Sequence, residues 1–172
     1  MSDFDDSFAH VLGVEGDYSN NPFDSGGPTK YGITQDTLSS YRGKPCYEAD
    51  VKNLSLNEAK MIYRARYWNT LNLDDINNND LATVIFEQAV NRGAVTAAKQ
   101  IQNLCGVKED GMIGPKSIES INLKPPLGLA FKFICASQES YCRIVQKNPT
   151  QAVFITGWIK RTHKLLDLIF KR

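Results

Sequence analysis

The chain has 172 residues, which is enough to bury a hydrophobic core without disulfides and fits one or two small domains. Its formal net charge of +1 excludes a strongly charged protein, but the two ends differ. Residues 1–30 contain six acidic residues against one lysine, and residues 143–172 contain seven basic residues against one acidic residue. These charges either cover solvated helix faces or form a cationic end that approaches a polyanion such as cell wall, nucleic acid or an acidic membrane surface.

The four cysteines are far apart and include no CxxC pair, so neither a metal site nor a cofactor is expected. We expect all four to be small buried apolar residues, as in a protein made in a reducing compartment. The first residues are acidic where a secretory signal would be basic and then apolar, and no apolar run approaches the roughly 20 residues of a membrane span. We therefore expect synthesis in the cytoplasm, no membrane insertion and, without positive signs of a dimer, a monomer.

The pattern of the first half predicts helices separated by one turn-rich segment. Asp3 is placed to cap a helix that ends at Gly13 or Gly16. The turn-rich segment 17–33 has room for a short hairpin around Lys30–Ile33. Further helices are predicted in three places, one from Thr34 to Gly43, one after a capping box at residues 55–58, and one from Asn79 to Gly93.

The second half is predicted to be entirely helical. A short helix is expected from Ala97 to Leu104, and another begins with Pro115 at its first position. Two long amphipathic helices follow, at roughly 127–147 and 151–170, with Thr150 as the cap of the second. The fold class is therefore mainly α with a small β-hairpin beside a glycine-rich loop, and residues 1–93 and 94–172 are expected to pack as one globular unit.

Glu15 follows the first predicted helix and is the first candidate catalytic residue. The last turn of a helix presents unpaired carbonyl groups and a partial negative charge, which disfavour an ionised carboxylate. We therefore expect a raised pKa at Glu15, so that its carboxylic acid can donate a proton to a glycosidic oxygen.

Asp24 and Thr29 lie in the glycine-rich loop that follows. The backbone amides around Asp24 can hold its carboxylate ionised, so that it activates water or stabilises an oxocarbenium-like transition state. Alternatively, Asp24 forms an Asx turn. Thr29 is a candidate for orienting the water, and Gly27 allows the backbone to approach a sugar ring closely. Since the chain between Glu15 and Asp24 does not fix the separation of the two carboxyl groups, retaining and inverting chemistry both remain open.

Several spaced motifs resemble the muramidases of glycoside hydrolase family 108 and, more distantly, phage-type lysozymes. In chain order the motifs are Glu15-Gly16-x-Tyr18, Asn21-Pro22-x-Asp24-x-Gly26-Gly27-x-Thr29, Tyr31-Gly32-Ile33-Thr34, Tyr67-Trp68, Ala89-Val90-Asn91-Arg92-Gly93, Asp110-Gly111-x-Ile113-Gly114-Pro115 and Gly157-Trp158-Ile159-x-Arg161. They cover nearly the whole chain, including the C-terminal segment that the family describes as a predicted peptidoglycan-binding region.

The resemblance implies cleavage of the β-1,4 bond after N-acetylmuramic acid, with Glu15 as the catalytic glutamate. The implied partner is therefore the glycan strand of peptidoglycan, with no nucleic acid involved, and the enzyme would act on the wall after its release. Two positions depart from the family pattern. Asp17 replaces a usual glycine, and Glu87 replaces a usual aspartate that can buttress the cleft.

Further candidates for substrate binding come from the aromatic and polar residues of these motifs. Tyr18, Tyr31 and Trp68 are candidates, although an aromatic residue beside an amphipathic helix is more often part of the core. Thr34 is a second hydroxyl candidate, but capping a helix suits it better. Asn91 can bind an acetamido group or a backbone turn.

Two other classes of function remain open at this stage. The chain could be a cell-wall binding module without catalysis, in which the basic C-terminal helices carry the affinity. It could also be a secretion-accessory protein that uses the fold as a scaffold. Among enzymes, chitinase or chitosanase activity is the alternative to a muramidase.

Overall fold

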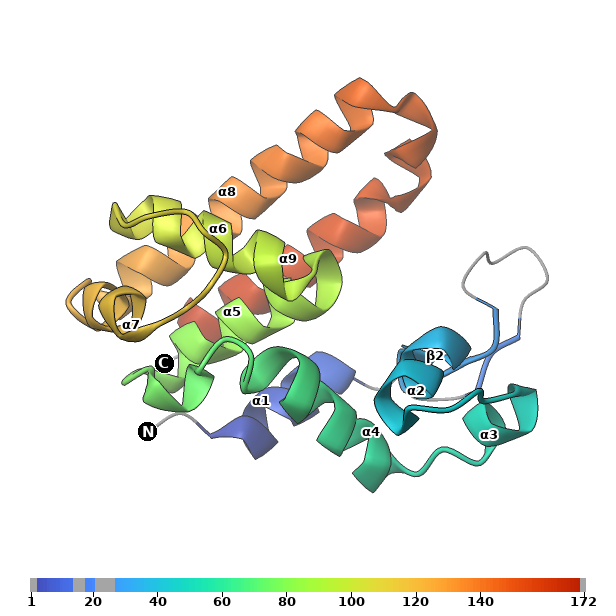
Figure 1. Cartoon of the computed structure of the whole chain (residues 1–172). Helices are drawn as coiled ribbons and strands as arrows, with labels where there is room; N and C mark the ends of the chain where they lie inside the picture. The colour runs from blue at the N-terminus through green and yellow to red at the C-terminus, as the bar shows by residue number, and fades with distance from the viewer. Residues whose placement is uncertain (1–2, 14–17, 21–26, 171–172) are drawn as a thin grey trace.

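The computed structural model describes residues 3–13, 18–20 and 27–170. The predicted class is confirmed, because these residues form a mainly helical fold with one small antiparallel hairpin. Figure 1 shows α5 (Asn79–Arg92) in the middle of the molecule and the hairpin and short helices at lower right. Above them, α8 (Pro126–Lys147) and α9 (Ile155–Phe170) lie side by side, and their joined ends project to the upper right. Among the described residues, no helix has the length and apolar character needed to cross a bilayer.

The first helix, α1 (Phe4–Leu12), begins and ends as its sequence predicts. A side-chain oxygen of Asp3 accepts hydrogen bonds from the backbone N–H groups of Asp5 and Asp6, which satisfies donors that the first turn leaves unpaired. The helix ends at Gly13, whose φ of 61° is a conformation that favours glycine. The chain therefore leaves α1 immediately before residue 14.

The hairpin consists of β1 (Thr29–Lys30) and β2 (Ile33–Thr34), with Thr29 paired to Thr34 and Lys30 to Ile33. The two residues between the strands, Tyr31 and Gly32, both have positive φ values, 52° and 72°. This is the backbone of a two-residue turn that matches the right-handed twist of the strands. The hairpin predicted around Lys30–Ile33 is therefore confirmed.

Short helices and turns connect the hairpin to the centre of the fold. They are α2 (Gln35–Arg42), α3 (Glu48–Lys52), α4 (Leu56–Tyr63), the π-helical turn η1 (Arg64–Trp68) and the 3-10 turn η2 (Leu73–Asp75). The cap of α2 is confirmed, since the Thr34 hydroxyl accepts a hydrogen bond from the Thr37 N–H at 3.2 Å. The capping box of α4 is only half present. Ser55 caps the helix, but the Glu58 carboxylate forms a two-pronged ion pair with Arg42.

The central helix α5 is buried on all sides from Leu81 to Ala89, as expected for a helix surrounded by other elements. It packs against α1, α6 (Ala94–Cys105), α8 and α9. Its buried polar side chains need hydrogen-bond partners, and Thr83 finds one in Ser7 of α1, with 2.6 Å between the hydroxyl oxygens. One continuous core contains residues from both halves of the chain.

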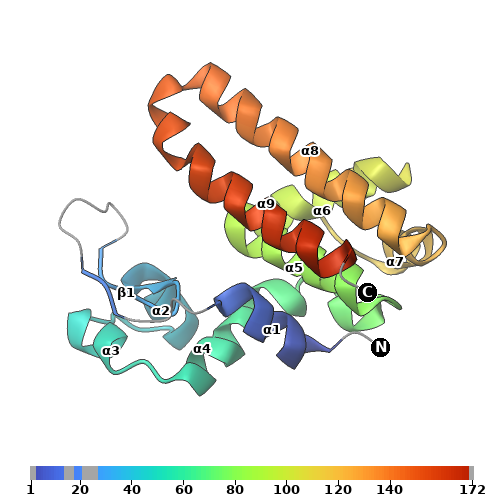
Figure 2. The same ribbon diagram turned by 180° about the vertical axis from the view of Figure 1, so that it is seen from behind.

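The C-terminal part contains α6, α7 (Pro115–Asn122), α8, the 3-10 turn η3 (Pro149–Phe154) and α9, and Figure 2 shows α8 and α9 from the other side. The prediction that Thr150 caps the last helix is wrong. The Asn148 side chain accepts from the Thr150 N–H and opens η3, so α9 begins only at Ile155. Trp158 packs between the two long helices, with its ring stacked on Tyr141 at a centroid distance of 4.9 Å.

The prediction that all four cysteines are buried is only half right. Cys46 and Cys105 are buried, whereas Cys135 is half-buried and Cys142 is exposed. Both lie on α8 beside buried residues, Cys135 next to Ile134 and Cys142 next to Tyr141, so they occupy the helix face that is turned away from the core. The sequence pattern predicted the helix, but packing decides which of its faces is covered.

Candidate active-site groove

A groove runs along the C-terminal end of α1, between the hairpin and α9. It consists of two adjoining cavities of about 440 and 240 Å³ that share Val11, Leu12 and Arg161. We call it the α1–α9 groove. Its lining residues come from both halves of the chain and are His10, Val11, Leu12, Gly13, Tyr31, Gly32, Tyr63, Glu87, Val90, Asn91, Gly157, Lys160, Arg161 and Lys164.

The two predicted catalytic carboxyl groups, Glu15 and Asp24, lie outside the described residues. The last described residue before Glu15 is Gly13, and Gly13 lines the groove. The third predicted catalytic residue, Thr29, is half-buried on β1, and its hydroxyl donates a hydrogen bond to the Gly27 carbonyl at 3.1 Å. Thr29 also pairs through its backbone with Ser19, which ties the segment 18–20 to the hairpin.

A buried carboxyl group forms part of the groove on the α5 side. Glu87 is 5% exposed, and its oxygens lie 2.9 Å from the Gln88 amide nitrogen and 3.6 Å from an Arg161 guanidinium nitrogen. Burial raises the pKa of Glu87, while the positive charge of Arg161 opposes that rise. The carboxyl group at position 87, which was predicted to buttress the cleft, therefore lies on α5 at the wall of the groove, and its charged partner Arg161 comes from α9.

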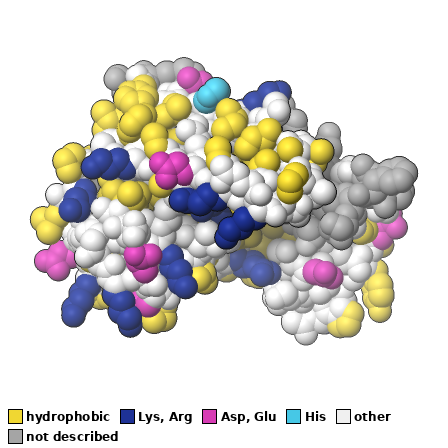
Figure 3. Space-filling view, turned by 90° about the horizontal axis from the view of Figure 1, so that it is seen from above, with side chains coloured by type: hydrophobic (Ala, Val, Ile, Leu, Met, Phe, Trp, Pro, Cys, Tyr) yellow, Lys and Arg dark blue, Asp and Glu magenta, His cyan; other side chains and the backbone are white. Residues whose placement is uncertain are grey.

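Arg161 lines the groove and belongs to one of the family motifs, but it was not among the residues predicted to bind substrate. It was detectable in principle, because a glutamate on a helix that is otherwise buried requires a cation or hydrogen-bond donors from elsewhere. The pattern could not say which of the many basic residues of the C-terminal helices would supply that cation. Together with Lys160 and Lys164, Arg161 makes the α9 side of the groove basic. Seen from above, basic side chains gather along the hollow between the larger helical part and the part that carries β1 and β2 (Figure 3).

Substituting Glu87 with Gln is expected to change how stability depends on pH. Since the folded-state pKa of Glu87 is raised above its ordinary 4.5, its contribution to stability is present below that value and is lost as pH rises through the folded-state pKa. Each unit of that rise corresponds to about 1.4 kcal/mol. Melting temperatures measured from pH 4 to 8 should therefore decline less in Glu87→Gln than in the wild type. Glu119→Gln, at an exposed position of α7, is the control, and parallel curves for wild type and Glu87→Gln would contradict the expectation.

Three of the predicted substrate-binding residues line or adjoin the hairpin side of the molecule. Tyr31 is half-buried and lines the groove, with the Lys30 ammonium 5.3 Å from its ring centre. Gly27 has a φ of 64° and open space where a Cβ would lie. Thr34 instead bonds both the backbone and the hydroxyl of Thr37, which fits the helix-cap alternative.

Tyr18 is held on α3 by its own hydrogen bond. Its hydroxyl donates to the Glu48 carboxylate at 2.6 Å, and this bond lowers the pKa of Glu48. The Lys52 ammonium lies 5.3 Å from the centre of the Tyr18 ring. Both contacts tie residues 18–20 to α3, so Tyr18 has a positioning role in the described fold.

Asn91 lines the groove at the end of α5, where its amide nitrogen donates to the Tyr141 hydroxyl at 2.7 Å. This bond uses the amide nitrogen of Asn91 and not its side-chain carbonyl oxygen. Within the described residues, the partner of the Asn91 amide nitrogen is a side chain of α8 and not a backbone turn. Asn91 therefore links α5 to α8 at the wall of the groove.

The prediction that Trp68 binds substrate is wrong. Trp68 is fully buried, its indole N–H donates to the Asp74 carboxylate at 2.8 Å, and its ring packs edge-on against Phe4 and Phe86. The π-helical turn η1 shifts the residues after α4 and directs this side chain into the core. No face of the ring is left for a sugar.

Gly32 permits a close approach that any side chain would obstruct. A Cβ at this position would lie 2.6 Å from the Tyr63 hydroxyl oxygen, which donates to the Tyr31 carbonyl at 3.0 Å. Substituting Gly32 with Ala is expected to lower the free energy of unfolding by about 1–2 kcal/mol from the positive φ alone, with the contact adding to that loss. Urea denaturation measures the change. Gly128→Ala is the control, since a Cβ there meets nothing within 4 Å, and equal losses in both variants would contradict the expectation.

No group of three or more His, Cys, Asp or Glu side chains in the described ranges could hold a metal ion. The groove instead combines a carboxyl group of raised pKa, a basic wall, a half-buried tyrosine ring and an amide. Polar groups of this kind, with few apolar side chains between them, suit a hydrophilic polymer better than a compact apolar ligand.

Comparisons with known proteins identify both halves of the chain. Residues 8–93 match the family model for glycosyl hydrolase 108, and residues 96–163 match that of a predicted peptidoglycan domain. Among solved structures, SagA of Brucella abortus superposes with a TM-score of 0.85 at 29% sequence identity, over 98% of this chain and 94% of that chain. No curated protein sequence matched the chain. The chain therefore belongs to the glycosyl hydrolase 108 family and is a glycoside hydrolase with a C-terminal domain that suggests peptidoglycan binding.

Proposed function

We propose that the protein is an N-acetylmuramidase that hydrolyses the β-1,4 bond between N-acetylmuramic acid and N-acetylglucosamine in peptidoglycan. The observation that carries the proposal is the α1–α9 groove, which lies at the end of α1 and is lined by residues of both matched regions. Its basic side, formed by Lys160, Arg161 and Lys164, suits a polymer that carries carboxylates.

In the proposed mechanism, Glu15 is the general acid that protonates the glycosidic oxygen. Asp24 acts as the base or stabilises the oxocarbenium-like transition state, and Thr29 orients the attacking water. Two observations support these roles. Gly13, two residues before Glu15, lines the groove. The Thr29 hydroxyl donates its hydrogen to the Gly27 carbonyl, so the lone pairs of the hydroxyl oxygen remain to accept a hydrogen bond from water.

Further contacts with the glycan are proposed for Tyr31, Asn91 and Glu87, which all line the groove. The Tyr31 ring can stack on a sugar face, and the Asn91 carbonyl oxygen can accept from an acetamido N–H. Glu87 keeps Arg161 in place and can accept from a sugar hydroxyl. We further propose that the enzyme is made in the cytoplasm and reaches the cell-wall peptidoglycan after release.

Digestion of purified peptidoglycan, followed by mass spectrometry of the soluble fragments, tests the proposal. Fragments that end in reducing N-acetylmuramic acid are expected. Reducing N-acetylglucosamine would identify a different glycosidic bond, and hydrolysis of chitin or chitosan oligosaccharides in its place would favour the chitinase or chitosanase alternative. Sedimentation with peptidoglycan without any released fragment would identify a binding module, and neither binding nor release would favour an accessory scaffold.

A further inference from the structure

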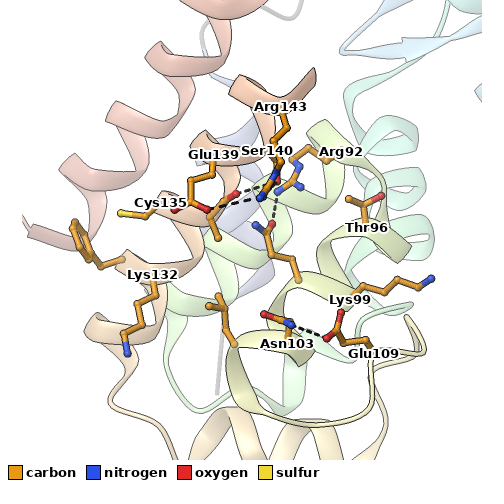
Figure 4. A pocket seen from close by; sticks show the side chains of 14 residues that line it. Arg92, Thr96, Lys99, Asn103, Glu109, Lys132, Cys135, Glu139, Ser140 and Arg143 are labelled. Carbon is orange, nitrogen blue, oxygen red and sulfur yellow. Dashed lines mark hydrogen bonds and ion pairs between the residues drawn. The ribbon is translucent and has the colours of Figure 1, made fainter. Parts of the chain in front are cut away.

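A second groove lies in the C-terminal part of the molecule, between α6 and α8. It has a volume of about 620 Å³ and separates Lys99 and Asn103 of α6 from Lys132 and Arg143 of α8 (Figure 4). We call it the α6–α8 groove. Its floor contains apolar groups from Leu104 and other side chains of the two helices, while its rim is polar.

The rim of the α6–α8 groove has an excess of positive charge. Four cationic side chains line it against two carboxylates, Glu109 and Glu139. Glu109 already accepts a hydrogen bond from Asn103 at 2.6 Å. Glu139 lies 4.0 Å from Arg143 in an exposed pair, which contributes little attraction. The groove therefore retains capacity for an anionic ligand.

Lys99 and Lys132 are the two cationic side chains of the groove that are most available to bind an anionic ligand. Both are exposed, and neither forms an ion pair with another residue in the part of the chain that the structure describes. Figure 4 shows them on opposite sides of the groove, one from each helix. This placement favours a ligand with at least two separated anionic groups.

Arg92 gives the groove a fixed cationic end. Its guanidinium donates to Ser137 at 2.9 Å and to Gln100, and it lies 5.8 Å from the centre of the Tyr141 ring. These contacts come from α6 and α8, so they hold the guanidinium in one orientation before any ligand binds. Burial lowers the pKa of Arg92, but an arginine remains charged at neutral pH.

Both grooves adjoin one depression at the end of α5. A depression of about 260 Å³ between α5 and the α8–α9 hairpin is lined by Asn91, which also lines the α1–α9 groove. The same depression is lined by Arg92 and Thr96, which also line the α6–α8 groove. The depression therefore lies between the two grooves, where a side branch of a ligand in the α1–α9 groove would meet Asn91 and Arg92 first.

We propose that the α6–α8 groove binds the carboxylate-bearing peptide stem of peptidoglycan, an inference that depends on the muramidase function proposed above. Peptide stems branch sideways from the muramic acid residues of the glycan, and they carry free carboxylates separated by short apolar side chains such as the methyl group of alanine. The groove offers features that match these groups, namely a fixed guanidinium and separated ammonium groups for the carboxylates and an apolar floor for the methyl groups. Such contacts would make a peptide-bearing glycan a better ligand than a bare one.

Isothermal titration calorimetry with a free tetrapeptide stem, obtained by amidase digestion of peptidoglycan, tests this proposal on the full chain. The stem should bind saturably, and binding should weaken at least tenfold in a variant with Lys99→Ala, Lys132→Ala and Arg143→Ala. A stem whose carboxylates are converted to amides should also bind at least tenfold more weakly. Because the rim charges are exposed, affinity should fall as ionic strength rises.

A matched variant controls for the loss of three positive charges. Lys44→Ala, Lys116→Ala and Lys147→Ala remove exposed lysines that line neither groove, and this variant should bind the stem as the wild type does. Equal weakening in both triple variants, or equal binding of inorganic polyphosphate and stem, would overturn the proposal in favour of general anion attraction. Thermal melts of all variants establish that each is folded.

The outcome separates this proposal from the proposed function. Wild-type protein that releases reducing muramic acid but does not bind the stem would overturn the peptide site alone. Protein that binds the stem but releases no fragment would contradict the muramidase function and leave a stem-binding domain.

Discussion

Replacing Glu15 with Gln is expected to lower the rate of peptidoglycan hydrolysis by about 10²–10⁴-fold, which is the usual contribution of a positioned general acid. The amide has nearly the shape of the carboxylic acid but has no proton of suitable acidity for the leaving glycosidic oxygen. Release of reducing sugar ends from purified peptidoglycan measures the rate. The melting temperature should stay close to that of the wild type.

Glu119→Gln is the matched control for this substitution. Glu119 is exposed on α7 and lines neither groove, so its replacement changes the charge equally and should leave hydrolysis at the wild-type rate. Full activity of Glu15→Gln would exclude Glu15 as the acid. The described acidic residue to test next would be Glu87, because its raised pKa and its place in the α1–α9 groove suit a proton donor.

Replacing Trp68 with Ala is expected to reduce the free energy of unfolding by about 3–5 kcal/mol, the range typical of a large aromatic side chain lost from a core. The ring lies 5.3 Å from that of Phe4 and 5.4 Å from that of Phe86, and the substitution would leave a cavity between α1 and α5. The Asp74 carboxylate would also lose the indole donor. Urea denaturation, monitored by circular dichroism, measures the loss.

Tyr31→Asn provides the contrasting variant. Tyr31 lines the groove with a φ of 52°, and asparagine tolerates this left-handed conformation, so the substitution removes the ring with little backbone strain. It is expected to raise KM for peptidoglycan severalfold with little change in stability. A raised KM for Trp68→Ala, together with unchanged stability, would instead restore Trp68 as a sugar-stacking residue.

The sequence predicted local structure well where neighbouring residues decide it. Asp3 and Thr34 cap helices because a side-chain oxygen reaches an N–H two or three residues away, and nothing distant competes with that bond. The turn at Tyr31-Gly32 follows equally from adjacent residues. Glu58 shows the limit of this reasoning. Its predicted bond to the cap of α4 was displaced by Arg42, because a charged and distant partner binds a carboxylate more strongly than a backbone N–H does.

The candidate site could be predicted only in part. The family motifs selected Tyr31, Asn91 and Glu87, and the structure brings all three to one groove. The same reasoning misplaced Trp68, since an aromatic residue after a helix can face either solvent or core, and the π-helical turn that decides between them has no clear signal in the sequence.

By itself, the sequence determined which segments are helical, where most of them begin and end, and which family's motifs the chain carries, because these features depend on residues within a few positions of one another. Only the tertiary structure decided that Arg161 of α9 pairs with Glu87 of α5, and that one groove is lined by both halves of the chain. Such contacts depend on how helices pack. Judged from the sequence, several basic residues could pair equally well with a buried carboxyl group. The packing of the helices around the core brings one of them, Arg161, next to Glu87.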